Sequence, residues 1–471
     1  MPLSDTFVTA IKAALGPKGW SQEAAALEQV SQPWRGTFEG HTPLLLLPAT
    51  TDEVSAVVKL CAQHHVALTP QGGNTGLVDG GTPHGEVTLS LRRMHAVREV
   101  DPFNNSLVIE AGAPLVNAQQ AAAEAQRLFP LSLGSEGTAT IGGLISTNAG
   151  GVAVLRYGMM RDLILGLEVV LADGQIWNGL SGLRKNNTGY DLKHIFAGAE
   201  GTLGIVTAAT LKLFPQTARA SAWISCNSAQ DVVQLLALMR DEAGDTITSF
   251  EMIPANAIKM VQADLPQIRD PNPSNLNWRV LCEVSLAQED MARTLLESAL
   301  EKALDSGLAQ DAVIAQSAQH AQDFWAVRES IPLSKRAYGT SLNHDVSVPV
   351  SRIPAFLEST ERALRSLMTE VEIVAFGHVG DGNLHYSACA ADPNDQTLLK
   401  QNAEAVTEIV HTQAMAQGGS ISAEHGVGRL KCDELVRRRP PAATAAMQAI
   451  KQALDPQGLF NPGRVVPVKE R

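Results

Sequence analysis

The alternation of apolar and polar residues predicts that the chain begins with mixed helices and strands. Residues 4–15 carry helical spacing and predict an N-terminal helix. Residues 43–48 form an apolar run bounded by prolines, which predicts a short buried strand. Thr50 and Glu53 have the spacing of a capping box, so a helix is expected over residues 54–65. Strand, helix and strand in this order open many folds that combine helices with a sheet.

The pattern changes after Pro215, where a strand ends on a proline. Before it, strands are predicted over 66–69, 87–91 and 106–112, and an Ala/Gln-rich helix over 115–128. After it, amphipathic helices are predicted over 230–240 and 289–304, a strand over 280–284 and a loop over 264–277. The alternation of strands with long helices favours an antiparallel sheet backed by helices. We therefore place the first domain boundary at about Pro215.

The composition is that of a globular protein of two or three domains. The chain has 471 residues, of which 45% are hydrophobic and 18% charged. A net charge of −12 without a long basic run argues against a nucleic-acid partner. The N-terminus lacks the basic and apolar regions of a signal peptide, and no apolar stretch is long enough to span a membrane. Five cysteines without a CxxC pair favour buried thiols in a reducing compartment, so we expect a cytoplasmic protein.

Three Gly-rich stretches carry the first candidate chemistry: residues 70–81, 134–151 and 198–207. Because Gly has no Cβ, consecutive backbone N–H groups can approach an anion closely. An isolated stretch of this kind is more often a surface loop, but three of them could surround one extended ligand that contains a pyrophosphate, such as a dinucleotide. The sequence contains neither GxGxxG nor GxxxxGK[ST], which argues against a Rossmann or Walker site.

The three stretches resemble the flavin-binding segments of the vanillyl-alcohol-oxidase type of FAD domain. Residues 132–151, 167–174, 187–192 and the stretch around Glu200 are similar to the D-2-hydroxyglutarate and D-lactate dehydrogenase group, over nearly the whole chain. The resemblance implies an α+β fold in three parts. These are a FAD-binding domain over 1–215, a substrate-binding cap of antiparallel sheet and helices over 216–431, and a C-terminal helical segment over 432–471 that returns to the FAD domain.

The resemblance also implies FAD as the cofactor. The residues expected to bind it are Pro70, Gly72, Gly73, Asn74, Thr75, Gly76, Leu77, Gly134, Gly137, Thr138, Gly142, Gly143, Ser146, Asn148, Gly150, Gly151, Tyr157, Glu200, Gly201, Gly204, Ile205, Val206 and Asn461. No His lies between Gly72 and Gly76, so we expect the FAD to be held there without a covalent bond.

A second candidate site surrounds the sequence from Val374 to Tyr386. Asp381-Gly382 between apolar flanks predicts a two-residue hairpin turn, which would place His378 opposite His385. Directly opposed residues hold their Cβ atoms ~5 Å apart, so both rings could reach one metal ion. A His pair of this kind is more often two hydrogen-bonded side chains than a metal site.

A third candidate ligand lies in the stretch Ser422 to Gly428. Glu424 could complete a site of two His and one carboxylate, with His425 beside it as a base; the alternative is a loop that happens to hold polar residues. Both stretches are similar to the metal and catalytic motifs of the 2-hydroxyacid dehydrogenases. That resemblance implies His378, His385 and Glu424 as ligands of a divalent metal, with zinc expected, and His425 as the residue that takes the proton.

Arg328 is the candidate for substrate recognition. On sequence alone, a helical Arg near an apolar face snorkels or pairs with a carboxylate such as Asp323 or Glu329 as readily as it binds a ligand. The resemblance implies that Arg328 binds the substrate carboxylate, where its planar fork allows two parallel hydrogen bonds.

Two departures from the family pattern concern the substrate. Asn343 stands where the D-2-hydroxyglutarate enzymes carry Lys, and Ser387 where they carry Asn, and both positions belong to the family's substrate contacts. If the family Lys binds a distal carboxylate, Asn343 should lower efficiency for dicarboxylates about tenfold to a hundredfold. This holds unless another cation, such as Lys335 or Arg336, reaches the pocket.

Together these features predict flavin- and metal-dependent oxidation of a D-2-hydroxy acid to the 2-oxo acid, most similar to D-2-hydroxyglutarate dehydrogenase. The alternatives are a dehydrogenase of D-lactate or another 2-hydroxy acid, an oxidase that uses oxygen, and a flavin-binding subunit without turnover. The sequence leaves the electron acceptor open among an electron-transfer flavoprotein, a quinone and a cytochrome, and it leaves a homodimer open.

Overall fold

The computed structural model describes residues 3–33, 38–392 and 396–467, and these form two compact units. The first unit comprises the described residues of Met1–Gly151, Gly158–Gln216 and His425–Arg471, and the second comprises those of Val152–Tyr157 and Thr217–Glu424. The sequence placed the corresponding boundaries after residues 215 and 431. The return to the first unit therefore begins at His425, directly after the candidate ligand Glu424.

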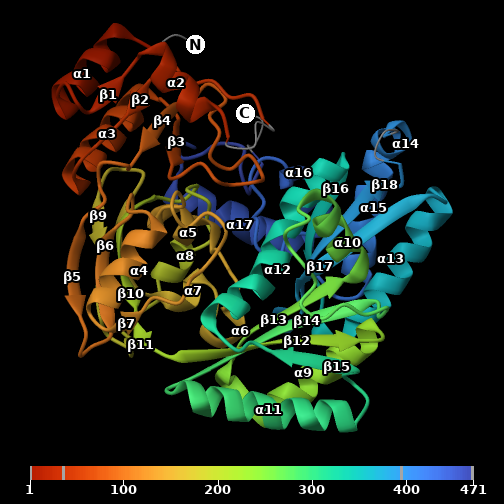
Figure 1. Cartoon of the computed structure of the whole chain (residues 1–471). Coiled ribbons are helices and arrows are strands. Elements are labelled where there is room, and N and C mark those ends of the chain that lie inside the picture. Colours follow the sequence, from red (N-terminus) through yellow and green to blue (C-terminus); the bar gives the residue numbers. More distant parts are fainter. Residues whose placement is uncertain (1–2, 34–37, 393–395, 468–471) are drawn as a thin grey trace. The chain divides into compact units, whose positions relative to one another are not determined.

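The first unit contains a small mixed sheet with strand order β1-β2-β4-β3 (Figure 1). Its strands are β1 Trp20–Ser21, β2 Leu45–Leu46, β4 Val87–Ser90 and β3 Leu68–Gln71, and its helices are α1 Asp5–Leu15, α2 Ala24–Ser31 and α3 Thr51–His64. Strand β4 is parallel to both β2 and β3. Parallel neighbours need a crossover, and α3 supplies it between β2 and β3. The first Gly-rich stretch begins at the C-terminal end of β3.

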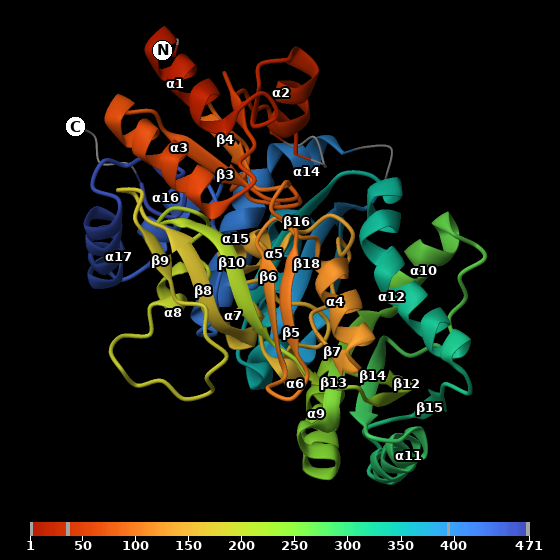
Figure 2. The same cartoon turned by 90° about the vertical axis from the view of Figure 1, so that its left-hand side faces the viewer.

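A second, antiparallel sheet of the first unit has the order β5-β6-β10-β8-β9, and Figure 2 shows these strands side by side. The strands are β5 Val97–Asp101, β6 Ser106–Glu110, β10 Ile205–Lys212, β8 Ile164–Val170 and β9 Ile176–Asn178. A further pair joins β7 Arg127–Leu128 to β11 Phe214–Pro215. The remaining helices are α4 Leu115–Glu124, α5 Ile141–Thr147, α7 Met160–Leu163, α8 Lys193–Phe196, α16 Cys432–Arg438 and α17 Pro441–Leu454.

Local signals set the starts of the predicted helices. The Ser4 side chain caps α1 by accepting from the backbone N–H of Phe7, and Thr50 caps α3 by accepting from that of Glu53. Both predicted helices are confirmed. The prediction of one helix over 115–128 is wrong at its end, because α4 stops at Glu124, and Arg127 and Leu128 pair with β11.

The second unit is built on one antiparallel sheet with the order β15-β12-β14-β13-β17-β18-β16 (Figure 1). Its strands are β15 Asp311–Ile314, β12 Ala218–Cys226, β14 Trp278–Leu286, β13 Ile247–Pro254, β17 Val371–His378, β18 Asn383–Ala390 and β16 Ser341–Ser347. The prediction of an antiparallel sheet backed by helices is confirmed. Strands β13 and β17 pair only at Glu251↔His378 and Met252↔Gly377 among the described residues, so a short joint connects the two halves of the sheet.

Helices cover both faces of this sheet. One face packs against α9 Ala229–Ala243, α11 Glu289–Asp305, α13 Ile353–Leu367 and α15 Ala403–Ala416 in a large apolar core. The other packs against α10 Ala255–Asp264 and α12 Ala318–Tyr338, and includes Phe324, Val327 and Phe376. The shorter elements are α6 Val154–Tyr157, α14 Thr397–Gln401, η1 Gly244–Thr246, η2 Val350–Arg352 and η3 Val379–Asp381. The buried charged side chains Glu251, Arg328 and Lys335 lie on the α12 side.

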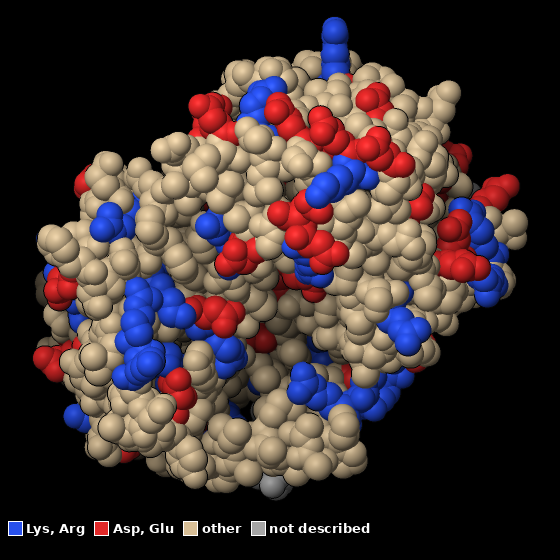
Figure 3. Space-filling model, turned by 90° about the horizontal axis from the view of Figure 1, so that it is seen from below, with Lys and Arg blue, Asp and Glu red and all other residues tan. Residues whose placement is uncertain are grey.

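The burial of the cysteines and the distribution of surface charge can be compared with what the composition predicts. All five cysteines are buried free thiols, as predicted. On the face shown in Figure 3, acidic and basic side chains are interspersed. Among the described residues, no helix combines the length and the apolar character that crossing a membrane requires.

Candidate active site

The three Gly-rich stretches come together in the first unit. A Cβ on Gly73 would lie 1.9 Å from the carbonyl oxygen of Thr138, so the first stretch touches the second backbone to backbone. The backbone N–H of Glu200 donates to the carbonyl of Ser146 at 2.8 Å, which joins the second stretch to the third. The Asn461 amide donates to the carbonyl oxygens of Gly80 and Glu200, at 2.9 and 2.8 Å. Segments far apart in sequence therefore form one loop cluster.

This loop cluster suits a dinucleotide because several of its glycines border open space. At Gly76, Gly134 and Gly137 an added Cβ would meet no atom within 4 Å, so the backbone borders open space that a ligand can approach closely. The second stretch then enters α5, which contains Gly142, Gly143 and Ser146 and ends at Asn148 in the left-handed conformation. Of the residues predicted to bind FAD, Tyr157 alone lies in the second unit.

Glu200 has a second role, because it holds the segment that begins with His425. Its carboxylate accepts from the backbone N–H groups of Val427 and Gly428, both at 2.7 Å. Burial raises the pKa of Glu200, although both hydrogen bonds favour the ionised form. The residue thus fixes the backbone two and three positions beyond the predicted base.

In the second unit, Glu251 connects two predicted site residues. Its carboxylate accepts from Nε of Arg328 at 2.7 Å and contacts Nδ1 of His378 at 2.6 Å. All three side chains are buried. Although burial opposes ionisation, His378 and Arg328 lower the pKa of Glu251 to about 2. Burial likewise opposes charge on His378, but Glu251 raises its pKa to about 9.

The predicted two-residue turn at Asp381-Gly382 is wrong. Strand β17 ends at His378, a 3₁₀ turn follows, and β18 begins at Asn383, so His385 pairs with Phe376. His378 pairs instead with Glu251 across the sheet joint. The two His rings nevertheless lie edge to face with centroids 5.4 Å apart. They are neighbours on the diagonal and not directly opposed.

Asp345, His385 and Glu424, with the adjacent His425, form a candidate metal cluster, since each offers one ligand atom and these atoms lie within 4.8 Å of one another; the predicted ligand His378 is not a member of this group. Burial lowers the pKa of His385 to about 3 against the opposing effect of Glu424, which favours the neutral ring that binds metals. Asp345 already accepts from the amide of Asn383 at 2.7 Å and from the backbone N–H of Glu424 at 2.9 Å. Its contacts therefore position Glu424.

The two substrate positions that depart from the family pattern meet at Lys335. Its ammonium group donates to Oδ1 of Asn343 at 2.8 Å and also to the hydroxyl of Ser387. Lys335 is 6% exposed. Its Nζ and the guanidinium of Arg328 both lie over the ring of Phe376, at 5.2 and 4.7 Å from its centre. Helix α12 thus brings two cations to the face that carries the candidate metal cluster.

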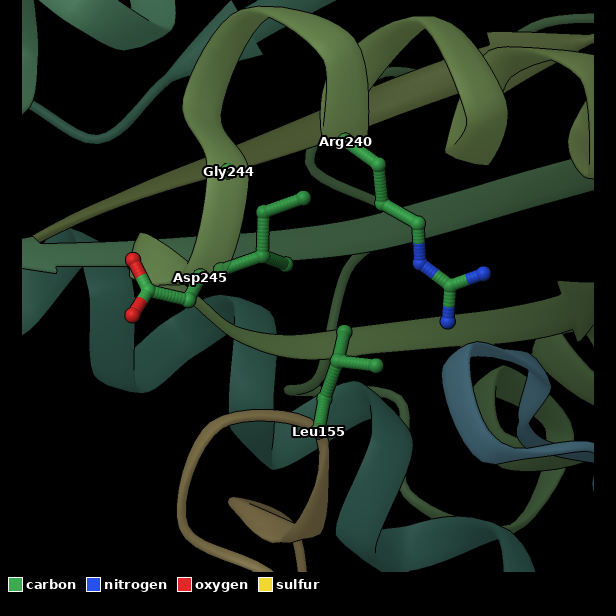
Figure 4. A pocket seen from close by; sticks show the side chains of 5 residues that line it. Leu155, Arg240, Gly244 and Asp245 are labelled. Carbon is green, nitrogen blue, oxygen red and sulfur yellow. The ribbon is translucent and has the colours of Figure 1, made fainter.

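A cavity of about 320 Å³ lies beneath the turn that follows His378. It is lined by Leu155, Arg240, Gly244, Asp245 and Ile247 (Figure 4). Arg240, from α9, donates to the carbonyl of Gly380 in that turn at 2.6 Å. The cavity lining supports the His378 turn and does not include a predicted site residue.

Two family models match the chain. The model described as "FAD binding domain" matches residues 42–179, and that described as "FAD linked oxidases, C-terminal domain" matches residues 215–465. The second match covers more than half of the chain. The Gly-rich stretches 70–81 and 134–151 thus lie in a FAD-binding domain.

The chain is also similar to named enzymes over nearly its full length. It is 37% identical to the mitochondrial D-2-hydroxyglutarate dehydrogenase of Arabidopsis thaliana, over 98% of this chain and 81% of the relative. It is 33% identical to the D-2-hydroxyglutarate dehydrogenase of Xanthomonas citri pv. viticola, over 98% and 97%. The chain is also similar in fold to a crystal structure of p-cresol methylhydroxylase with substrate bound, with a TM-score of 0.77 at 18% identity over 99% of this chain and 98% of that one. The fold is the vanillyl-alcohol-oxidase type, and the chain belongs to the FAD-dependent D-2-hydroxyacid dehydrogenase family.

Proposed function

We propose that this protein oxidises D-2-hydroxyglutarate, or a closely related D-2-hydroxy acid, to the 2-oxo acid with FAD and a divalent metal ion. The observation that carries the proposal is the buried group on the α12 face of the second unit. There Arg328, Glu251 and His378 adjoin His385 and Glu424. Relatives named D-2-hydroxyglutarate dehydrogenase support the choice of substrate.

His378, His385 and Glu424 would hold the metal, with zinc the ion that this nitrogen and oxygen donor set suits. Nδ1 of His378 is engaged by Glu251, which orients the ring and leaves Nε2 as the ligand atom. Glu424 Oε1 lies 3.7 Å from Nε2 of His385. A metal at these atoms would supply Lewis acidity toward the hydroxyl and carboxylate oxygens of the substrate.

Arg328 binds the substrate carboxylate in this proposal. Its Nε donates to Glu251, which fixes the plane of the guanidinium, and the edge formed by its two terminal nitrogens would donate to the substrate carboxylate. His425 follows Glu424 in the chain and takes the hydroxyl proton. FAD, when bound, would supply the acceptor for the hydride of the α-carbon. Glu200 holds the backbone after His425 and so positions the base.

Anaerobic mixing of the purified flavoprotein with D-2-hydroxyglutarate tests this function. We expect the D-enantiomer to bleach the flavin absorbance and the L-enantiomer to leave it unchanged. After the protein has been treated with a chelator, neither enantiomer should bleach the flavin. Bleaching that chelation leaves unchanged would remove the metal from the proposal. Bleaching by D-lactate alone would move the function to the lactate enzymes. Rapid reoxidation by air would favour an oxidase.

A further inference from the structure

Lys335 lies where the sequence departs from the related dehydrogenases. It comes from α12, whereas Asn343 and Ser387 face each other on β16 and β18. Its ammonium group donates to both of these side chains, and Ser387 also donates to Oδ1 of Asn343 at 2.9 Å. A helix therefore places a positive charge beside these two strand residues.

The register of the sheet places this charge relative to the candidate metal cluster. Asp345 pairs with His385, and Asn343 pairs with Ser387, in two successive rows on the same face of the sheet. Rows two residues apart are separated by about 7 Å along the strands. The metal-binding row and the lysine row thus form two fixed points on one surface, with Phe376 beside both.

This separation suits a substrate with two acidic ends. If the hydroxyl-bearing carbon of a five-carbon diacid lies at His385 and Glu424, its second carboxylate is two methylene groups away and extends toward Lys335. A diacid with one methylene group falls short by about one C–C bond, ~1.5 Å. A monocarboxylic acid brings an apolar end to a buried ammonium group, which is unfavourable because the cation loses hydration without gaining an anion.

We propose that Lys335 binds the second carboxylate of a five-carbon D-2-hydroxy diacid and is the residue that sets the preference for diacids. The assignment rests on the proposed function. Asn343 and Ser387 position the ammonium group and do not themselves supply the charge.

The wild-type flavoprotein tests the assignment with acids of matched length. We expect kcat/KM for anaerobic flavin bleaching to be about tenfold to a hundredfold higher with D-2-hydroxyglutarate than with D-2-hydroxyvalerate, which has the same chain but no second carboxylate. Among diacids, D-2-hydroxyglutarate should exceed D-malate and D-2-hydroxyadipate. A preference for the monoacid, or an optimum at D-malate, overturns the assignment.

The variant Lys335→Met tests the residue itself, with Arg336→Met as control, since Arg336 is exposed on the same helix. We expect Lys335→Met to bring the two five-carbon acids to within about threefold of each other, and Arg336→Met and Lys335→Arg to retain most of the preference. Equal losses for both acids in Lys335→Met overturn the assignment. If Lys335→Met does not fold, the wild-type series decides.

The two proposals fail in different ways. If neither five-carbon acid bleaches the wild-type flavin, the proposed function is wrong and this inference falls with it. If D-2-hydroxyvalerate bleaches the flavin as efficiently as D-2-hydroxyglutarate, the oxidation of 2-hydroxy acids stands and only the role of Lys335 is lost.

Discussion

Nδ1 of His378 lies 2.6 Å from Oε1 of Glu251, at one of the two residue pairs described between β13 and β17. The same carboxylate binds Arg328, so one buried acid orients a candidate metal ligand and a candidate substrate ligand. Removing it would affect both residues together.

Glu251→Gln should therefore abolish flavin reduction by substrate while FAD stays bound in the first unit. It should also destabilise the second unit by about 3–5 kcal/mol, because the buried guanidinium of Arg328 loses its counter-charge. Denaturant titration measures the loss. The control is Glu297→Gln, which breaks an exposed helical pair with Arg293 and should change stability by less than about 0.5 kcal/mol. Equal effects of the two variants would contradict the bridging role.

His385→Ala should release the metal and stop flavin reduction without loss of FAD. The reason is that His385 belongs to the candidate metal cluster in the second unit and not to the Gly-rich loops. Metal analysis and the flavin spectrum of the purified variant test this. An active enzyme without metal would exclude the metal from the mechanism.

Two glycine variants separate FAD binding from folding. Gly137→Ala adds a methyl group toward open space, so it should lower FAD occupancy and leave the stability of the FAD-free protein nearly unchanged. Gly73→Ala would place the methyl group against the carbonyl of Thr138 and should lower both. Flavin content and thermal unfolding of the FAD-free proteins distinguish the two.

In each case acid denaturation should release intact FAD, and flavin retained on the precipitated chain would contradict non-covalent binding.

The ion pair between Glu86 and Arg464 should make the stability of the first unit decrease at acid pH. Burial opposes ionisation of Glu86, but Arg464, at 2.6 Å, and backbone N–H groups hold its pKa below the usual range. A depressed acid pKa stabilises the fold above the unfolded value of 4.5, and the contribution is lost as pH falls further. Arg464→Met should therefore flatten the loss of stability below pH ~4.5. An unchanged acid profile would exclude this pair as its cause.

Asn343→Lys should no longer increase the preference for dicarboxylates, because Lys335 already lies against this side chain. A second ammonium group beside the first should instead leave the ratio of kcat/KM for D-2-hydroxyglutarate over D-2-hydroxyvalerate unchanged or lower it. A rise of tenfold or more would show that the pocket lacks a cation in the wild type.

The sequence predicts those features that depend on neighbouring residues. Helices α1 and α3 begin where Ser4 and Thr50 cap them. The Gly-rich loops are predicted by their high glycine content. The hairpin register was missed because His378 pairs with Glu251, which lies 127 residues away along the chain. Glu251 itself was missed, although a single carboxylate within the apolar run Phe250–Pro254 was a usable signal.

The order of segments in the first unit has a consequence for biosynthesis. Asn461 donates to the carbonyl oxygens of Gly80 and Glu200, and Arg464 pairs with Glu86, so residues that follow the second unit in the chain complete contacts of the N-terminal half. Apart from its short insertion Val152–Tyr157, the second unit is continuous from Thr217 to Glu424 and is synthesised before those contacts can form. Chains emerge from the ribosome N-terminus first, so the cap can fold during translation. The contacts that Asn461 and Arg464 make with the N-terminal half can form only after the second unit has been synthesised, so we expect FAD to bind after that unit has been made.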